Sequence, residues 1–377
     1  MNWIFSLKTA FVIAILLLVG YTLLLNNEAT WVLEDLALPN GDTRLKKATP
    51  QPVRQQINFS VQERTYQGDL YKPAQPPLAA LVLVPGLAEN GKDDFRLVAL
   101  ATTLARARFL ILIPDLPNLR ALKVRPEDSQ GVTDAFVYLL AQRELPVHTP
   151  AGIGAFSYAV GPAVLAALDP TIRERVNFIL GVGGYYDLTQ VIIFFTTGYF
   201  QKEGQWHYLE PNRYGKWVFV LSNAERLADP VDRAMFSSIA KRKLANPHAD
   251  INDLITHLTP EGQSLLDLIE NRDPERTPAL ITKLPDSILS DLDALNLATK
   301  DLTQLQAQLI LLHGTDDTII PYTESLKLAA AVPSTKSNLF LIDGFAHVHV
   351  QSNDLDRFTL WRAIRLLLTQ RQDSISE

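Results

Sequence analysis

The chain of 377 residues contains no cysteine. Disulfide bonds, zinc sites with thiolate ligands, iron–sulfur clusters and cysteine nucleophiles are therefore excluded. A chain without cysteine suits an oxidising compartment, because no stray thiol can mispair there. The sequence also has no excess of basic residues, since 35 Lys and Arg stand against 41 Asp and Glu, for a formal net charge of −6. A nucleic-acid-binding protein needs a basic face to neutralise phosphates, so the charge argues against nucleic acid as a partner.

Internal repeats and low-complexity tracts are missing as well. Apolar residues make up 47% of the chain and charged residues 20%. These fractions are usual for globular proteins and exclude extended disorder. The length is sufficient for a large buried core, either in one large α/β unit or in two to three domains.

There is one long hydrophobic run, residues 9–25, which reads TAFVIAILLLVGYTLLL. Nineteen residues without charge separate Lys8 from Glu28. As a helix this stretch extends about 28 Å, close to the thickness of a bilayer's hydrocarbon core. The run is longer than a signal-peptide core and lacks a small-x-small cleavage site. Residues 1–26 are therefore predicted to be an uncleaved transmembrane anchor, with a cleaved signal peptide or a buried helix as the alternatives.

The charges around this segment predict its orientation. Lys8 precedes it and Glu28 follows it. The positive-inside tendency then puts the N-terminus in the cytoplasm and the remaining chain outside, in the periplasm or the extracellular space. Basic residues within 44–47 lie near the edge of the counting window and act against this orientation.

The remaining chain shows alternating strand and helix patterns. Residues 27–55 are polar and interrupted by prolines, so a stalk is predicted there. Residues 57–71 alternate around a polar centre, which favours a hairpin. Short apolar runs then alternate with helical segments, and such runs are typical of strands buried on both faces of a parallel sheet. The predicted strands lie at 78–84, 109–114, 151–156, 176–182, 308–312 and 338–342.

The alternation stops over residues 188–305, where helical patterns, aromatic residues and charges prevail. The sheet pattern returns at residue 306. We therefore expect an α/β fold with a mostly parallel sheet covered by helices, whose core comprises residues 56–187 and 306–377. The helical segment 188–305 is predicted to be an inserted cap.

Ser157 follows a predicted buried strand and precedes a helix, in the stretch AGIGAFSYAVGPAVLAAL. A nucleophile at such a turn projects from the carboxyl edge of the sheet, beside a helix N-terminus that favours negative charge. The sharp turn requires small residues two positions away on either side, and these are Ala155 and Ala159 rather than glycines. A serine that merely caps the helix is the alternative.

Two later segments supply the partners that a nucleophilic serine needs. Asp317 follows the apolar run in LILLHGTDDTIIP, and His347 follows the run in NLFLIDGFAHVHV. A serine hydroxyl is a weak nucleophile, so a base must take its proton, and a carboxylate must orient that base. The order Ser, Asp, His, with each residue just beyond a strand, resembles the α/β-hydrolase family, in its serine esterase, lipase or dienelactone-hydrolase-like branch.

The resemblance covers about residues 57–187 and 306–368 and implies a role for each site residue. Ser157 is then the nucleophile, His347 the general base and later acid, and Asp317 the orienting carboxylate. The backbone N–H groups of Leu87 and Tyr158 are expected to form the oxyanion hole. No metal or organic cofactor is implied.

Several other residues compete for these roles. Asp316 is the alternative acid and His349 the alternative base, while Asp187 is more consistent with a capping residue. Ser222 follows the apolar run WVFVL, but the β-branched Val220 two positions before it fits a sharp turn badly, and Ser129 lies in a polar stretch without a strand. Metal binding by the two histidines with the aspartate pair is a further alternative, although no third-ligand motif is visible.

Aromatic residues are dense in residues 191–208. Phe194, Phe195 and Tyr199 are candidates for lining a substrate pocket, although such residues also form ordinary cap cores. Together these features predict a membrane-anchored serine hydrolase, acting on a hydrophobic ester through an acyl-enzyme. The alternatives are an acyltransferase, thioesterase or amidase on the same fold, and a catalytically silent binding or scaffold domain. The sequence predicts no oligomeric state.

Overall fold

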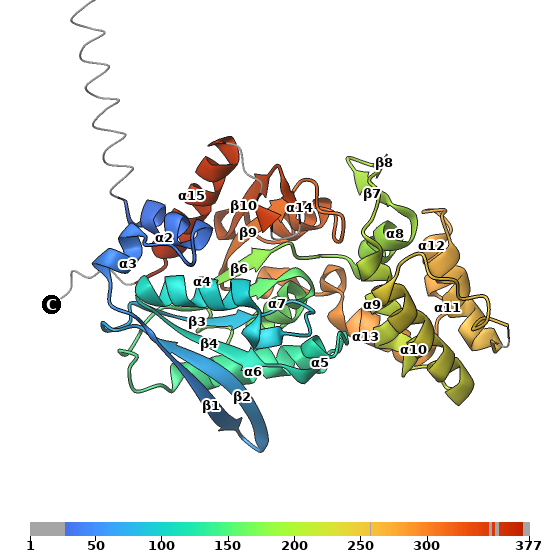
Figure 1. Cartoon of the computed structure of the whole chain (residues 1–377), viewed down its shortest axis with the longest axis horizontal. Coiled ribbons are helices and arrows are strands. Elements are labelled where there is room, and N and C mark those ends of the chain that lie inside the picture. The colour runs from blue at the N-terminus through green and yellow to red at the C-terminus, as the bar shows by residue number, and fades with distance from the viewer. Residues whose placement is uncertain (1–26, 257, 347–348, 351–353, 372–377) are drawn as a thin grey trace, which may run out of the picture.

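A computed structural model describes residues 27–256, 258–346, 349–350 and 354–371 (Figure 1). Its centre is an eight-stranded sheet in the order β1-β2-β4-β3-β5-β6-β9-β10. The β1–β2 and β2–β4 pairs are antiparallel, and all other pairs are parallel. The strands are β1 (Val53–Val61), β2 (Arg64–Lys72), β3 (Ala79–Val84), β4 (Phe109–Asp115), β5 (Ala151–Phe156), β6 (Phe178–Val182), β9 (Gln308–Gly314) and β10 (Ser337–Ile342).

Both faces of the sheet are covered. In β3, all six residues are buried, and successive residues alternate between two hydrophobic clusters. Val82 faces the cluster built with α6 (Glu127–Leu140) and α7 (Val160–Leu168), whereas Leu81 faces the cluster built with α2, α4 and α15. Continuous apolar runs thus form central strands because both neighbouring layers exclude water.

The second layer consists of α4 (Phe95–Arg106), α15 (Asp354–Leu368) and α2 (Glu28–Ala37). Figure 1 shows α2, near the N-terminus, lying beside the C-terminal α15. The remaining core helices are α3 (Arg44–Ala48), α5 (Pro117–Arg120), α14 (Thr323–Ala330) and the short 3-10 helices η1 (Gly91–Asp93), η2 (Ser157–Ala159) and η5 (Ser334–Lys336).

The prediction of a stalk over residues 27–55 is wrong. Ala29 and Val32 of α2 are completely buried against the core. Asp35 accepts a hydrogen bond of 2.7 Å from the Thr103 hydroxyl of α4, and Arg371 forms an ion pair with Glu28. Residues 27–55 are mostly polar, but α2 has a narrow apolar stripe at helical spacing. This stripe packs against α15 and α4.

A largely helical insertion lies between β6 and β9, at one side of the sheet in Figure 1. It also contains a small hairpin, which the sequence did not predict. The insertion comprises α8 (Leu188–Thr197), β7 (Tyr199–Lys202), β8 (Gln205–Tyr208), α9 (Arg213–Ala224), α10 (Pro230–Ala245), α11 (Pro260–Glu270), α12 (Thr277–Ile281), α13 (Asp286–Leu295), η3 (Leu297–Thr299) and η4 (Leu302–Gln304).

Residues 9–25, predicted to cross a membrane, lie outside the described residues. Within the described ranges, no helix combines the length and the apolar character that a membrane span requires.

Candidate active site

Ser157 occupies a sharp turn between β5 and α7. Its φ angle is +53°, in the left-handed region that residues other than glycine rarely adopt. Such a conformation costs about 1–3 kcal/mol and persists only where the surrounding structure enforces it. Ser157 is partly exposed, whereas Tyr158 and Ala159 after it are buried. The turn therefore directs the Ser157 side chain out of the core, while the two residues after it stay inside.

The two positions that flank Ser157 are alanines, and the close packing around the turn is provided by glycines on the neighbouring strand and loop. Ala155 and Ala159 are both completely buried. A Cβ atom at Gly184 would stand 2.5 Å from Val160, the first residue of α7, and one at Gly181 would stand 3.2 Å from it. These two glycines let α7 approach the end of β6 closely. Close packing on the neighbouring strand thus supports the turn.

The loop after β3 lies against this turn. A Cβ atom at Gly86 would be 3.4 Å from the Ser157 Cβ and 3.3 Å from the Phe156 carbonyl oxygen. Leu87, the next residue, lines the same cavity as Ser157 and Tyr158. Among the described residues, no acceptor pairs with the backbone N–H of Leu87 or Tyr158. Two such N–H groups beside a nucleophile are what an oxyanion hole requires.

The Tyr158 ring is anchored beneath the turn. Its hydroxyl donates to Asp128 Oδ2 at 3.0 Å and accepts from the Arg125 backbone N–H at 3.1 Å. Asp128 also accepts from Asn118 at 3.1 Å. Burial raises the pKa of Asp128 to about 6 and raises the pKa of Tyr158 well above its usual value. This buried group positions the residue that follows the nucleophile, and no local motif signalled it in the sequence.

Asp317 is buried in the loop after β9. Its Oδ1 accepts backbone N–H groups from Ile319 at 2.8 Å and Ile320 at 3.1 Å, and these contacts hold the carboxylate in place. Its Oδ2 lies 3.5 Å from the point where a Cβ atom of Gly183 would stand. Gly183, with φ of +62°, follows β6 directly. The carboxylate thus lies at the carboxyl edge of the sheet, as Ser157 does.

His313 of β9 forms a hydrogen bond that holds the loop of Asp317. It is completely buried at the end of β9, where its Nε2 donates to the Ile320 carbonyl at 3.0 Å and its Nδ1 contacts the Ser325 hydroxyl at 2.7 Å. Its Nε2 is also 3.4 Å from Asp317 Oδ2. His347, the predicted base, lies outside the described residues. The side chain of His349, the alternative base in β12 (His349–Val350), also lies outside them.

The competing residues have other structural roles. Ser222 is completely buried in α9, where its hydroxyl accepts from the Val124 N–H at 2.8 Å. The Ser129 hydroxyl donates to the Pro126 carbonyl within α6. Asp187 is the N-cap of α8 and accepts from the Thr189 N–H at 2.9 Å, which confirms the prediction of a capping residue. Asp316 is half-buried and directly precedes the buried Asp317 in the same loop.

A large cavity opens over Ser157 and has a volume of about 1370 Å³. Ligand pockets usually measure about 300–1,000 Å³, so this cavity accommodates a large ligand. Its surface is mostly apolar, and it reaches into the insertion through α8 and α9. Phe195 lines it, whereas the other two aromatic candidates, Phe194 and Tyr199, are not among the described residues that line it. Phe194 is completely buried and packs edge-on against Phe200.

Tyr185 and Tyr214 also line the cavity, and no motif in the sequence marks them as site residues. Tyr185 donates to the Leu295 carbonyl at 3.0 Å and packs on α7, where a Cβ atom at Gly161 would be only 2.0 Å from its hydroxyl. The Tyr214 hydroxyl donates to the Leu87 carbonyl at 3.2 Å. Both tyrosines connect the insertion to the residues around Ser157.

In the described part of the chain, no group of three or more possible metal ligands occurs.

Comparison with known proteins gives structural likenesses only. No model of a known protein family matches the sequence, and no curated protein is similar to it. A dienelactone hydrolase from Anabaena variabilis is 13% identical, with a TM-score of 0.45 over 85% of this chain and 97% of its own. The α/β hydrolase GrgF from a Penicillium species is 15% identical, with a TM-score of 0.48 over 83% of this chain and 99% of its own.

An acylaminoacyl peptidase from Pyrococcus horikoshii is 11% identical, with a TM-score of 0.47 over 90% of this chain and 46% of its own. The geometry of this chain itself identifies its fold. A strained serine joins a strand to a helix at the carboxyl edge of a mostly parallel sheet, and a buried aspartate follows a later strand of that sheet. By these features the chain has the α/β-hydrolase fold.

Proposed function

We propose that this protein is a serine hydrolase that cleaves carboxylic esters through an acyl-enzyme. The observation that carries the proposal is the conformation of Ser157, whose φ of +53° directs a partly exposed hydroxyl toward a largely apolar cavity. Strain of this kind is expected at a nucleophile rather than at an ordinary helix cap. Leu87 and Tyr158 line the same cavity as Ser157, and their backbone N–H groups, for which the described residues provide no acceptor, are proposed to bind the oxyanion.

In the proposed reaction, Ser157 Oγ attacks the ester carbonyl carbon while His347 takes the hydroxyl proton. The carbonyl oxygen becomes an oxyanion and accepts hydrogen bonds from Leu87 and Tyr158. The C–O bond to the alcohol then breaks, and His347 returns its proton to the departing oxygen. Water, deprotonated by the same histidine, attacks the acyl-enzyme and releases the carboxylic acid and free Ser157.

Asp317 is proposed to orient the imidazole of His347 and to stabilise its protonated form. The two backbone N–H groups that bind its Oδ1 hold the direction of the carboxylate. Asp316, the alternative acid, has no comparable pair of contacts among the described residues. Asp317 is therefore proposed as the carboxylate that orients His347.

The lining of the cavity favours a hydrophobic ester over a polar one. A polar ester would leave hydrogen-bonding groups unpaired against leucine, valine and phenylalanine side chains. Residues 9–25 are proposed to anchor the protein in a membrane with the catalytic domain outside the cytoplasm. A reporter fused after Glu377 that functions only outside the cytoplasm should be active, and an inactive reporter would reverse the orientation.

A fluorophosphonate probe tests the proposal, because it reacts only with an activated serine. The wild-type protein should be labelled, Ser157→Ala should abolish labelling, and His347→Ala and Asp317→Ala should slow it strongly. Ser238→Ala is the matched control, since that exposed hydroxyl of α10 donates to the Ala234 carbonyl and should not contribute. A folded wild-type protein that resists the probe would favour a silent binding domain. Product analysis with an added alcohol distinguishes hydrolysis from acyl transfer.

A further inference from the structure

The cavity above Ser157 extends to both faces of the sheet. One set of lining residues belongs to the α7 and insertion side, among them Tyr185, Leu188, Val191 and Phe195. A second set belongs to the opposite layer. Its apolar members, called the α2 arm from here on, include Val32 and Leu36 of α2, Leu97, Ala99 and Leu100 of α4, and Leu360 and Ala363 of α15. The same side of the cavity is also lined by the charged residues Glu34, Arg44, Asp94, Arg96 and Arg357.

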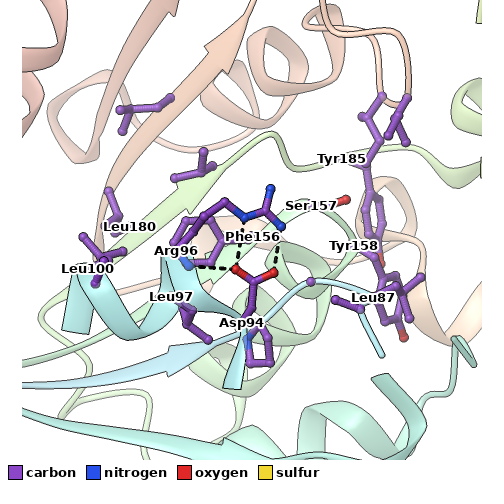
Figure 2. A pocket seen from close by; sticks show the side chains of 18 of the residues that line it. Leu87, Asp94, Arg96, Leu97, Leu100, Phe156, Ser157, Tyr158, Leu180 and Tyr185 are labelled. Carbon is purple, nitrogen blue, oxygen red and sulfur yellow. Dashed lines mark hydrogen bonds and ion pairs between the residues drawn. The ribbon is translucent and has the colours of Figure 1, made fainter. Parts of the chain in front are cut away.

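Ser157 lies where the two parts of the cavity meet. Figure 2 shows Leu97, Leu100 and Leu180 on one side of the pocket and Leu87, Tyr158 and Tyr185 on the other. The Ser157 hydroxyl lies between these groups. The ion pair of Asp94 and Arg96, at 2.8 Å, lies near the centre of the same view. A ligand bound at Ser157 can therefore extend toward either face of the sheet.

The α2 arm is built from aliphatic side chains. A cavity of this kind does not hold ordered water well, because water needs two to four polar partners. Its ideal occupant is a hydrocarbon chain, whose methylene groups gain free energy on leaving water. A compact ester would leave the arm empty.

Two strongly exposed apolar side chains line the cavity on the side of the α2 arm. Leu38, directly after α2, is 56% exposed, and Phe95, at the start of α4, is 72% exposed. Exposed large apolar residues are frequent where a protein contacts a membrane or another apolar partner. The elements that form the arm thus also present apolar side chains to the solvent.

The helix that lines this arm begins directly after the proposed membrane anchor. Asn27 caps α2, and residues 9–25 precede it. The ion pair of Glu28 with Arg371 and the hydrogen bond from Trp361 to Thr30 hold α2 against the body. An anchor in the bilayer would therefore keep this end of the cavity close to the lipid.

We propose that the α2 arm holds a hydrocarbon chain of a lipid ester that reaches Ser157 from the membrane. The proposal rests on the proposed esterase function and names its substrate class. The chain lies among α2, α4 and α15, and its scissile ester bond lies at Ser157. Each methylene held in the arm is expected to raise kcat/KM by up to about fourfold.

The test uses the full-length protein in nanodiscs. Ala99 of α4 lines the cavity and is partly exposed, so Ala99→Trp is expected to narrow the arm without disturbing the core. Ala363→Trp narrows it from α15. Val98→Trp is the matched control, because Val98 belongs to the same helix, is partly exposed and does not line the cavity.

Two ester series are compared: p-nitrophenyl esters from acetate to palmitate, and acetates of alcohols from ethanol to hexadecanol. Wild-type kcat/KM should rise with chain length in at least one series. In that series Ala99→Trp and Ala363→Trp should lower the long-chain value at least tenfold and leave the shortest ester within about twofold. Val98→Trp should alter neither. Equal effects on short and long chains, or no effect of Ala99→Trp on either series, would overturn the proposal.

The rate with the shortest ester also reports whether a variant is folded. If Ala363→Trp loses this rate, its result is not used, and the result for Ala99→Trp decides the test. If the wild-type protein cleaves no ester at all, the proposed function fails and the arm is tested by binding alone. The probe is then cis-parinaric acid, a fluorescent long-chain fatty acid. Binding that Ala99→Trp abolishes and Val98→Trp preserves would support the arm as a hydrocarbon site, and the absence of binding would reject it.

Discussion

The hydroxyl of Tyr214 donates a 3.2 Å hydrogen bond to the carbonyl oxygen of Leu87. Tyr214 belongs to the first turn of α9 in the insertion, whereas Leu87 belongs to the loop after β3. Two residues earlier, the Asn212 N–H donates to the Thr318 carbonyl at 2.7 Å, in the loop of Asp317. The start of α9 therefore holds both the proposed oxyanion loop and the carboxylate loop.

Replacement of Tyr214 by phenylalanine should weaken this positioning while the aromatic ring remains. The loss of one such hydrogen bond, worth about 0.5–1.5 kcal/mol, predicts a decrease of about 2- to 10-fold in kcat. KM should change little, since the ring that lines the cavity is retained. The measurement is steady-state hydrolysis of a short p-nitrophenyl ester.

Tyr208→Phe is the control for this prediction. Its hydroxyl bonds to Glu210 on the surface, and Tyr208 is 57% exposed. Its activity should equal that of the wild type. A Tyr214→Phe protein with unchanged kcat would mean that the loop of Leu87 keeps its geometry without this contact.

Gly161→Ala should destabilise the protein, although alanine normally stabilises a helix. The added Cβ would stand 2.0 Å from the Tyr185 hydroxyl, which is completely buried and bonded to the Leu295 carbonyl. Overpacking of this kind costs about 1–3 kcal/mol or more. Urea unfolding should show the loss, and hydrolysis should fall because Tyr185 lines the cavity.

Gly215→Ala is the matched helical substitution. A Cβ atom at Gly215 in α9 would have its nearest neighbour at 3.7 Å, an ordinary contact. Its stability should rise by about 0.5–1 kcal/mol, from helix propensity alone. Similar effects of the two substitutions would contradict the close packing of Tyr185 against α7.

Asp128→Asn should change the pH dependence of stability in the acid range. Burial raises the pKa of Asp128 to about 6, from 3.8 in the unfolded chain. The folded state then binds more protons between these two values, so wild-type stability falls as the pH rises through this window. The asparagine variant lacks this decrease, so its stability relative to the wild type should rise by up to about 3 kcal/mol between pH 4 and 6.5.

The free energy of unfolding, measured in urea at several pH values, checks this difference. Glu174→Gln is the control, because Glu174 is an exposed carboxylate that does not contribute to the raised pKa of Asp128. It should follow the wild-type curve. Parallel curves for Asp128→Asn and the wild type would show that burial does not raise the pKa of Asp128 in the folded protein.

Lys216→Met should alter the alkaline range, with the opposite slope. Burial, assisted by repulsion from Arg272, lowers the pKa of Lys216 to about 7 from 10.5. Its ammonium group donates to the Ile269 carbonyl at 3.1 Å and to the Thr196 carbonyl at 3.4 Å. The unfolded chain binds more protons between pH 7 and 10.5, so the wild type gains stability as the pH rises through this window.

The methionine variant has no such gain, so its stability relative to the wild type should fall by up to about 5 kcal/mol between pH 7 and 10.5. Lys241→Met, at an exposed position of α10, should leave the curve unchanged. A constant difference between Lys216→Met and the wild type would indicate that the buried amine keeps an ordinary pKa. Thermal and urea unfolding across the pH range provide both measurements.

Local sequence was sufficient for the features that depend on neighbouring residues. The apolar runs predicted the buried strands, and the small residues around Ser157 predicted a sharp turn after β5, which its positive φ angle confirms. The acidic side chain at 187 also behaves as a cap, because capping involves only residues two positions away.

Features that depend on distant segments were not predictable in this way. The segment expected to be a stalk contains α2, whose short apolar stripe is decisive only because α15 and α4 cover it. The contacts of Tyr214 with Leu87 and of Tyr158 with Asp128 join residues 127 and 30 positions apart. No local pattern distinguishes these side chains from ordinary core residues.

The sequence by itself determined the strands, the turn at Ser157 and the order of the candidate catalytic residues, because periodicity and turn chemistry act over a few neighbouring positions. Only the tertiary structure decided that the cavity reaches from Ser157 to α2. A cavity is bounded by side chains of elements far apart in the chain, and its shape depends on how closely those elements pack. The packing distance between such elements cannot be read from the sequence of any single segment.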